Sequence, residues 1–458
     1  MTGKTAAVRI FTFCFVSAAL LAACSADVEP IPPPPPEPVV TGPPTHAEYI
    51  ANLRVAGLTD TLLVDGWLTG AHTALRKPTG VAIPHEEAGI FVPHDVRSVG
   101  LAFNVIEGQT LRIAIDRSSD SRGRLFAQLF FNNPQDFETP FRQVATLTDT
   151  TGGEFTLTDS GRYILRLQPE LHASIDYRVR LELEAALPFP VSGHTRRSVL
   201  SFFGDVRDGG RRRHEGIDIF AKRDTPVVAV VDGTAVARES RRGGNVVWLR
   251  GGGRSYYFAH LNRIAISRRQ RVNAGDVIGY VGNTGNARTT PPHLHFGIYR
   301  RGWGAIDPFP YFEAFTFSEE PPESVFEPGF GVITTTGLNL RETPGTDQPP
   351  VTQLEAGTIV EKRAAAGDWL RVQLANGTAG WIHRRYQREA AAPVEPLRLV
   401  GDSWLHASPG GQPVERIRAG RPIYRFGSAS DWDLIGIDPQ EPMGWMPNRS
   451  PERASAGP

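Results

Sequence analysis

Short runs of alternating apolar and polar residues recur over residues 47–188. They predict β-strands, because successive side chains of a strand point to opposite faces. Turn residues such as Gly, Asn and Pro separate the runs, and many short strands at this spacing are typical of a β-sandwich. The clearest runs span residues 111–115, 125–131, 163–167 and 177–183.

A second series of runs, rich in β-branched residues, predicts a mostly antiparallel β-domain over residues 191–315. Three consecutive glycines at 251–253 predict a hairpin turn, and a Gly/Asn/Thr-rich stretch at 282–290 predicts a loop. We expect this domain to carry a groove. The predicted strands span residues 225–236, 245–249, 255–260 and 277–281, and one more begins at His293.

The C-terminal region contains an internal repeat. The pairs Asp368-Trp369 and Gly380-Trp381 recur as Asp431-Trp432 and Gly444-Trp445, at a shift of about 64 residues. The repeat predicts two small domains, at 330–388 and 396–450. Their tryptophans could pack in the cores or bind a ligand, and the sequence leaves this open.

The first residues read as an export signal. Lys4 and Arg9 precede an apolar run over 10–23 that is too short to span a bilayer. Leu21-Ala22-Ala23-Cys24 resembles a bacterial lipobox, which implies cleavage after residue 23 and acylation of Cys24. An ordinary signal peptide with an incidental cysteine is the alternative. Ser25 favours sorting to the outer membrane, and the proline-rich stretch 24–46 predicts an extended tether.

Composition excludes some functions. The 458 residues include 49 basic and 49 acidic side chains, so no global field favours nucleic acid as a partner. Both cysteines, Cys14 and Cys24, lie near the start, so a disulfide framework is not expected. Arginines cluster locally at 211–213 and 241–242, where they could serve solubility or attract an anionic wall or substrate.

Candidate chemistry lies in three short motifs: His214-Glu215-Gly216-Ile217-Asp218, His293-Leu294-His295 and a single His260. On strands, residues two or four apart share a face, so two strands could present three histidines and Asp218 to one point. His214 and Asp218 could also meet on a helix, but Gly216 and the flanking isoleucines argue for a strand. This donor set suits zinc, whose catalytic sites hold three protein ligands and a water. The surplus could supply a general base and an oxyanion donor.

These motifs, with Gly282-Asn283-Thr284-Gly285 and Ile306-Asp307-Pro308, resemble the M23 (lysostaphin/LytM-like) zinc metalloendopeptidases. The resemblance implies that His214, Asp218 and His295 bind Zn2+. It implies that His293 acts as the base and His260 as the oxyanion donor. Spacing alone could not separate the role of His293 from that of His295.

Further resemblances complete the domain prediction. Residues 47–188 resemble the bacterial pre-peptidase C-terminal sandwiches, and both C-terminal units resemble bacterial SH3-like barrels. The expected fold is therefore mainly β: a sandwich, an antiparallel peptidase domain and two small barrels.

The expected function is hydrolysis of peptidoglycan cross-bridges, at the D-alanyl–diaminopimelate bond in a Gram-negative wall or at glycyl-glycine bridges in another. The expected location is the periplasmic face of the outer membrane, anchored through lipidated Cys24. Peptidoglycan is the expected partner, and a wall amidase or the division machinery is a possible one. The alternative function is a non-hydrolytic activator of wall amidases. A secreted lysin fits less well, because the lipobox speaks against free release.

Overall fold

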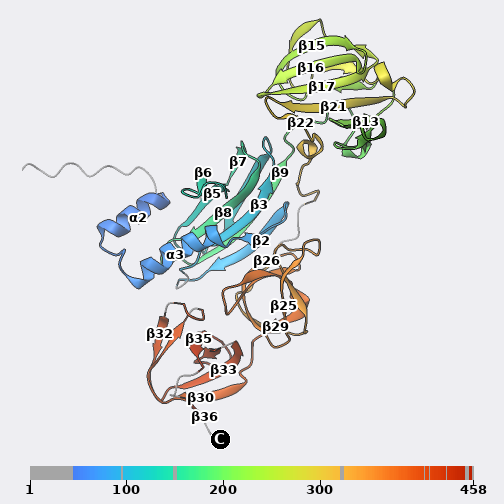
Figure 1. The fold of residues 1–458 in the computed structure, drawn as a ribbon. Coiled ribbons are helices and arrows are strands. Elements are labelled where there is room, and N and C mark those ends of the chain that lie inside the picture. Colours follow the sequence, from blue (N-terminus) through green and yellow to red (C-terminus); the bar gives the residue numbers. More distant parts are fainter. Residues whose placement is uncertain are drawn as a thin grey trace, which may run out of the picture. The chain divides into compact units, whose positions relative to one another are not determined.

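The computed structural model describes residues 45–455 apart from 94–95, 148–151, 320–323, 407, 412, 430 and 449–452 (Figure 1). The predicted signal peptide, Cys24 and most of the tether lie outside these residues. The chain divides into two units, residues 1–52 and 53–458. Within the described ranges, no helix has the length and apolar character needed to cross a membrane. The fold is mainly β, with several antiparallel sheets, as predicted.

Two helices precede the sandwich, and the sequence analysis missed both: α2 (His46–Val55) and α3 (Leu62–Arg76). The Thr61 hydroxyl caps α3 by accepting a hydrogen bond from the Val64 N–H. Buried Trp67 donates its indole N–H to the carbonyl of Pro169 at 2.7 Å. An apolar stripe at helical spacing, which includes Val64, Trp67, Ala71 and Ala74, was therefore present in the sequence.

The sandwich packs two layers, antiparallel except for the β1–β3 pair, around an apolar core that includes Leu101, Leu129, Leu165 and Val179. One layer has the strand order β1-β3-β8-β5-β6, and the other contains the order β2-β9-β4-β7. The strands are β1 (Thr79–Gly80), β2 (His85–Phe91), β3 (Val99–Val105), β4 (Thr110–Arg117), β5 (Leu125–Asn132), β6 (Phe141–Leu147), β7 (Gly153–Thr156), β8 (Gly161–Pro169) and β9 (Ile175–Glu184).

The second layer of the sandwich continues into the first C-terminal unit, because β2 pairs with β26 through Ala88↔Ala365 and Gly89↔Ala364. Trp381, fully buried, donates its indole N–H to the carbonyl of Gly80. The strands of this unit are β23 (Gly329–Ile333), β24 (Leu338–Arg341), β25 (Pro350–Leu354), β26 (Ile359–Ala366), β27 (Trp369–Leu374), β28 (Ala379–His383) and β29 (Gln387–Glu389).

The second C-terminal unit repeats this topology. Its order β32-β31-β35-β34-β33 matches β25-β24-β28-β27-β26 of the first unit, as the internal repeat predicts. Trp381 and Trp445 are both buried, so these two pack in cores. The strands are β30 (Glu395–Leu399), β31 (Ser403–His406), β32 (Pro413–Ile417), β33 (Pro422–Ala429), β34 (Trp432–Gly436), β35 (Gly444–Pro447) and β36 (Arg453–Ser455).

The domain with the three motifs is built on one large sheet, of order β10-β13-β21-β17-β16-β15-β19, with β22 beside β21. One face of this sheet is buried by residues such as Leu249, Phe258, Leu294 and Phe296. The opposite face carries His295. The sheet strands are β10 (Val199–Ser201), β13 (Ile217–Phe220), β15 (Gly233–Ser240), β16 (Gly244–Gly251), β17 (Arg254–Leu261), β19 (Arg269–Val272), β21 (His293–Arg300) and β22 (Gly304–Ile306).

Smaller elements complete this domain. The hairpin β11 (Val206–Arg207) and β12 (Arg212–Arg213) precedes β13, and a three-stranded sheet contains β14 (Pro226–Val228), β18 (Arg263–Ile264) and β20 (Val277–Tyr280). The predicted strand at 225–236 is split into β14 and β15. The predicted loop 282–290 holds the short helix η3 (Gly285–Ala287).

Candidate metal centre

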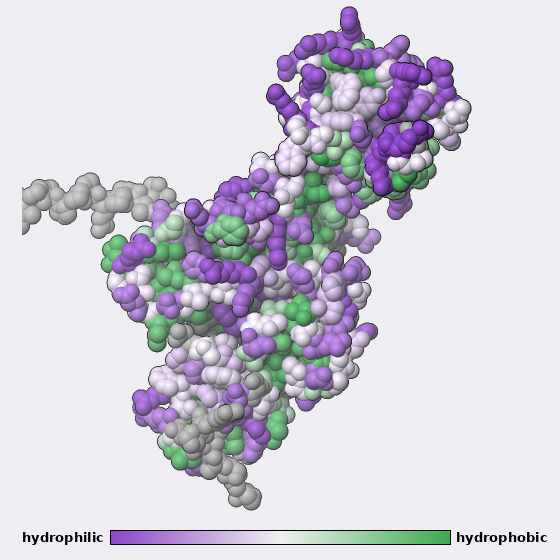
Figure 2. All heavy atoms as spheres, viewed as in Figure 1, coloured by the Kyte–Doolittle hydropathy of each residue, from purple (hydrophilic) through white to green (hydrophobic). Residues whose placement is uncertain are grey.

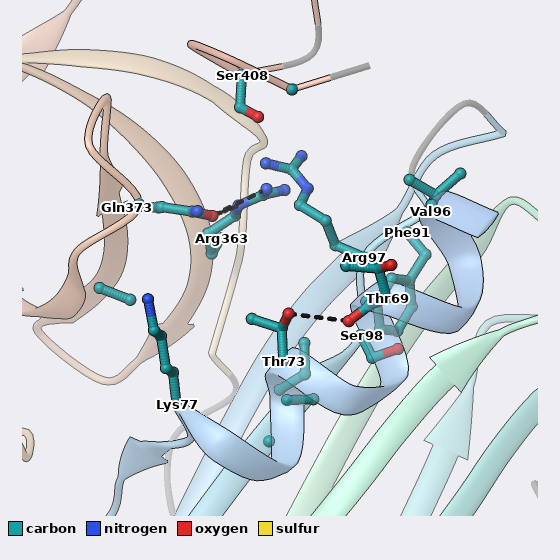
Figure 3. Close-up of a pocket in the computed structure, with 18 of the residues that line it drawn as sticks. Thr69, Thr73, Lys77, Phe91, Val96, Arg97, Ser98, Arg363, Gln373 and Ser408 are labelled. Atoms are coloured by element: carbon teal, nitrogen blue, oxygen red, sulfur yellow. Dashed lines mark hydrogen bonds between the residues drawn. The ribbon is translucent and has the colours of Figure 1, made fainter. Parts of the chain in front are cut away.

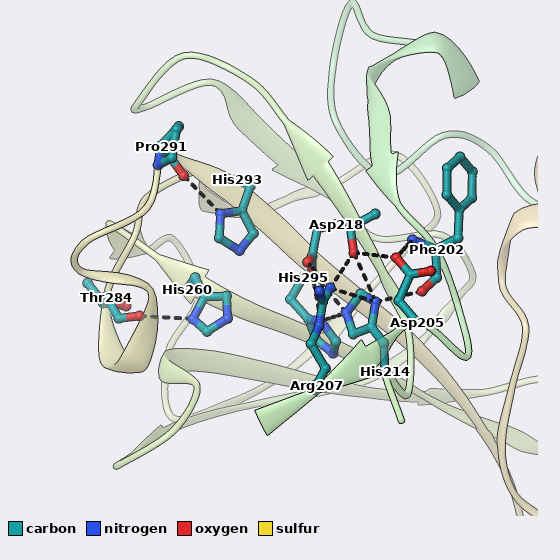
Figure 4. Close-up of polar contacts among 11 residues, drawn as sticks. Phe202, Asp205, Arg207, His214, Asp218, His260, Thr284, Pro291, His293 and His295 are labelled. Carbon is teal, nitrogen blue, oxygen red and sulfur yellow. Dashed lines mark hydrogen bonds and ion pairs between the residues drawn. The ribbon is translucent and has the colours of Figure 1, made fainter. Parts of the chain in front are cut away.

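Asp218 and His295 lie directly opposite each other on the neighbouring strands β13 and β21. His214 lies in the bend between β12 and β13, so our expectation that it shares a strand with Asp218 is wrong. Gly216 permits the bend. A Cβ atom there would lie 2.4 Å from the carbonyl oxygen of Phe296 and 2.9 Å from the imidazole of His295. The motif therefore brings His214 back over the sheet, next to the other two residues (Figure 4).

Three ligand atoms converge on one point. His214 Nε2 lies 3.1 Å from Asp218 Oδ1 and 2.9 Å from His295 Nδ1, and His295 Nδ1 lies 2.9 Å from Asp218 Oδ1. Tetrahedral zinc with bonds of about 2.0–2.1 Å requires ligand atoms roughly 3.3 Å apart, so the triangle is close to the size zinc needs. Among the described residues, this is the group of His, Cys, Asp and Glu side chains that could hold a metal.

Hydrogen bonding outside the triangle supports a cation inside it. The carbonyl oxygen of Phe202 can only accept, so His214 Nδ1, at 2.8 Å, donates to it. The neutral His214 ring then directs the lone pair of Nε2 at the carboxylate of Asp218. Two acceptors facing each other are unfavourable unless a cation lies between them, so the residues fit a divalent metal.

The charge state of the ligands suits metal binding. Burial alone would raise the pKa of Asp218, but the neighbouring His214 and His295 hold it well below its usual value. Burial lowers the pKa of His295. Near neutral pH the site therefore offers the Asp218 carboxylate and a neutral His295 imidazole, the forms that bind a metal.

Arg207, at the end of β11, is a site residue that the sequence analysis missed. Its Nη2 donates to Asp218 Oδ2 at 3.0 Å, and the same nitrogen hydrogen-bonds the Ser201 hydroxyl. Asp218 Oδ2 is thus engaged while Oδ1 faces His214 and His295. The arginine clusters at 211–213 and 241–242 are recognisable in the sequence as local groups of positive charge. Arg207 has no neighbouring arginine, so the sequence did not identify it as a site residue.

His260 and His293 lie together beside the triangle (Figure 4). Their ring centroids lie 5.0 Å apart, and His260 lies 6.0 Å from His295. Each ring donates Nδ1–H to a backbone carbonyl, that of Thr284 for His260 and that of Pro291 for His293, both at 2.9 Å (Figure 4). In the neutral rings Nε2 is then unprotonated in both.

The two histidines are held in different ways. His293 stacks on Phe220, with centroids 5.1 Å apart and an interplanar angle of 28°. His260 adopts a φ of 61°, a left-handed conformation that is uncommon for residues other than glycine and occurs often at functional sites. Burial lowers the pKa of His260 to about 4.

A cavity of about 690 Å³ lies far from these residues in the sequence, beside α3 and β3 (Figure 3). Two of the arginines that line it are paired: Arg97 forms two hydrogen bonds to Glu361, and Arg363 donates to Gln373. None of the three motifs contributes to its lining, so the cavity is not part of the candidate metal centre.

Comparison with known families agrees with this geometry. Residues 212–308 match the model described as Peptidase family M23, and residues 336–386 match the model described as Bacterial SH3 domain. The chain therefore contains an M23 peptidase domain and a bacterial SH3 domain, as the sequence motifs predicted.

Individual relatives match over the same region. An L-Ala--D-Glu endopeptidase of Bacillus subtilis is 41% identical over 145 residues, which cover 29% of this chain and 44% of the relative. The peptidoglycan DD-endopeptidase ShyA of Vibrio cholerae is 38% identical over 92 residues, which cover 19% of this chain and 21% of the relative. The chain thus spans less than half the length of these curated relatives.

Among solved structures, the catalytic domain of the antimicrobial peptidase lysostaphin from Staphylococcus simulans is 32% identical. The match covers 24% of this chain and 88% of that one, with a TM-score of 0.23.

Proposed function

We propose that this protein is a zinc metalloendopeptidase that hydrolyses peptide cross-bridges of bacterial peptidoglycan. The observation that carries the proposal is the convergence of His214, Asp218 and His295 on one point, with two further histidines beside it. The match to peptidase family M23 supports the same reaction class. Bound zinc would lower the pKa of its water from about 16 toward about 7 and would polarise the scissile carbonyl.

His293 is the proposed general base. Because Nδ1 donates to the Pro291 carbonyl, Nε2 can accept a proton from the attacking water and return it to the leaving amine. Stacking on Phe220 holds the ring in this orientation. Removal of a general base of this kind lowers the rate of hydrolysis by roughly 10²- to 10⁴-fold.

His260 needs a revised role. A neutral ring that donates Nδ1–H to Thr284 has no proton on Nε2 to give to an oxyanion. Burial keeps the ring neutral near pH 7, because its pKa is lowered to about 4. We therefore propose that His260 accepts a hydrogen bond from the O–H of the attacking water that His293 does not deprotonate.

The proposed function also includes the peptide bond that is cleaved and the cellular location of the protein. The relatives carry names that specify different bonds, including L-Ala–D-Glu, DD and glycyl-glycine linkages. We propose the D-alanyl–diaminopimelate bond, in keeping with a lipid-anchored protein at the periplasmic face of the outer membrane. Cys24, the proposed lipidation site, lies outside the described residues. The C-terminal barrels would hold the enzyme on its polymeric substrate.

The test is digestion of purified sacculi with mass analysis of the released muropeptides. Hydrolysis of the proposed bond would release new amine ends and convert cross-linked dimers into monomers. Binding to sacculi without new amine ends would instead favour the activator of wall amidases. Cleavage at L-Ala–D-Glu would retain the enzyme class and change the bond.

A further inference from the structure

The face of the sheet that carries the metal ligands continues well beyond them. In antiparallel pairs, directly opposed side chains lie on one face, so the register identifies the members of this face. Asp218 is opposite His295, which is opposite Ala259. Residues two positions away on each strand point to the same face. Through the register of the neighbouring strands, this face extends across β16, β15 and β19.

Aromatic residues follow the metal site on this face. Tyr257 is opposite Gly297 on one side and Trp248 on the other. The Tyr257 and Trp248 rings lie 4.6 Å apart, Trp248 and Tyr299 lie 5.2 Å apart, and Tyr257 lies 5.9 Å from His295. All three aromatic side chains are partly exposed, whereas the sequence neighbours of Trp248 and Tyr257 on the other face are buried. We call Trp248, Tyr257 and Tyr299 the aromatic shelf.

Arginines follow the aromatic shelf. Arg250 and Arg271 both oppose Thr234 on β15, from its two sides, and Arg269 opposes Val236 beside Trp248. All three are exposed, and in the described part of the chain none of them forms an ion pair. Other exposed arginines, such as Arg112 and Arg142, are paired with acids. In Figure 2, purple hydrophilic residues gather around the rim of this domain, and paler residues lie over β15–β17.

The length of this face suits a short peptide. Four strand spacings of about 4.8 Å separate β21 from β19, or roughly 19 Å, which is the length of five or six extended residues. Two guanidinium groups at its far end, on β19, and a third on β16 can each bind a carboxylate, in the two-pronged geometry that arginine favours. An acid, Glu215, lies beside the Tyr299 hydroxyl at the metal end, so the charge on the face is graded from one end to the other.

We propose that the aromatic shelf and Arg250, Arg269 and Arg271 form a subsite for the anionic stem peptide of the wall, whose free carboxylates bind the arginines while its backbone crosses the shelf. The inference rests on the proposed function and names the substrate class of that site. It selects stem peptides with free carboxylates over amidated ones.

The test compares two substrates, a purified cross-linked stem-peptide dimer and the same dimer with its carboxylates converted to carboxamides. Wild-type protein is compared with Arg250→Gln/Arg271→Gln and with Arg197→Gln, an exposed arginine in the short helix η1 (Arg196–Ser198), outside this face. Exposed ion pairs contribute about 0.2–1 kcal/mol each, so the double variant should raise KM for the free acid roughly fivefold with kcat unchanged. It should also abolish the preference over the carboxamide, while Arg197→Gln retains both values.

A second readout separates the two proposals. Fluorescence anisotropy of a labelled stem peptide measures binding whether or not cleavage occurs. No hydrolysis of either dimer, with binding still dependent on Arg250 and Arg271, would overturn the proposed function and support this subsite. Hydrolysis of both dimers with equal KM, unchanged in the double variant, would overturn the subsite and support the function.

Discussion

Backbone carbonyl groups determine the protonation pattern of the histidines at the metal site, because a carbonyl oxygen can only accept a hydrogen bond. Phe202, Thr284 and Pro291 supply these carbonyls to His214, His260 and His293. In the neutral rings, Nε2 is left as a lone pair in all three. His214 is the proposed metal ligand among them, and His260 and His293 are the proposed catalytic pair.

Substitutions at the ligands and at the base should separate metal binding from chemistry. Asp218→Ala removes the carboxylate shared by both ligand histidines, so zinc binding and hydrolysis should be lost together. His293→Ala should retain stoichiometric zinc, measured by elemental analysis, and lower kcat by roughly 10²- to 10⁴-fold. His72→Ala, on the exposed side of α3, is the control. A zinc-free His293→Ala protein would contradict the role of His293 as a base.

Arg207 should act through Asp218 by occupying Oδ2 and leaving Oδ1 for the metal. Partners of metal ligands typically contribute about 10- to 100-fold to metal affinity, so Arg207→Gln should weaken zinc binding by about that factor. A competition titration with a chromophoric chelator measures it. Arg213→Gln, an exposed arginine of β12, should leave the affinity unchanged. Equal zinc affinity in the Arg207 variant and the wild type would exclude this positioning role.

At the scale of elements, the local pattern predicted the strands of the metal-site domain well, since β16, β17, β20 and β21 fall near the expected runs. It failed for α3, because the alternating runs that follow this helix led us to predict a sandwich over the whole of residues 47–188. Strand pairing could not be predicted, because nothing local in the sequence shows that Asp218 faces His295, 77 residues away. The Pro291 and Thr284 contacts are made by backbone atoms, which leave no signature in residue type.

A buried charge network joins β2 of the sandwich to β27. The Arg371 guanidinium donates to Glu87 at 2.7 Å, and Tyr177 donates its hydroxyl to Glu87 at 3.0 Å. Burial alone would raise the pKa of Glu87, but Arg371 and His85 lower it to about 2. The folded pKa thus lies below the ordinary value of 4.5, so Glu87 contributes its full stability above about pH 4.5. That stability is lost as the pH falls toward 2.

Glu87→Gln should therefore destabilise the protein at pH 7 by about 3–5 kcal/mol, because the Arg371 charge stays buried without its partner. The loss should be smaller at pH 3. Denaturant unfolding at both pH values measures this. Glu154→Gln, which breaks the exposed pair with Arg112, should have little effect at either pH, because water screens this pair. An equal cost for Glu87→Gln at both pH values would contradict the assigned pKa.

At the scale of the whole molecule, motif and repeat together indicated the arrangement of modules. The family matches confirm the peptidase and the first barrel, and the shared strand order supports the second barrel. The sheet that runs from the sandwich into the first barrel could not have been foreseen, because its seam is only two residue pairs between small residues.

The proposed anchor can be tested separately from the chemistry. Cys24→Ser removes the thiol that would be acylated, so the protein should move from the membrane fraction to the soluble fraction after cell lysis. Immunoblotting of the fractions measures this. Purified Cys24→Ser protein should hydrolyse sacculi at the wild-type rate, because the metal site lies in a different part of the chain. Retention in the membrane fraction would exclude acylation of Cys24 as the anchor.

The distance in sequence between the ligands imposes an order of events. His214 and Asp218 are separated from His295 by about 80 positions and meet only once β13 has paired with β21. A newly synthesised chain therefore has no preformed metal site, and zinc would bind only after β13 and β21 have paired. The bound ion would then link the two strands and stabilise the folded domain. A chelator should therefore shorten the lifetime of the folded domain and also stop hydrolysis of the substrate.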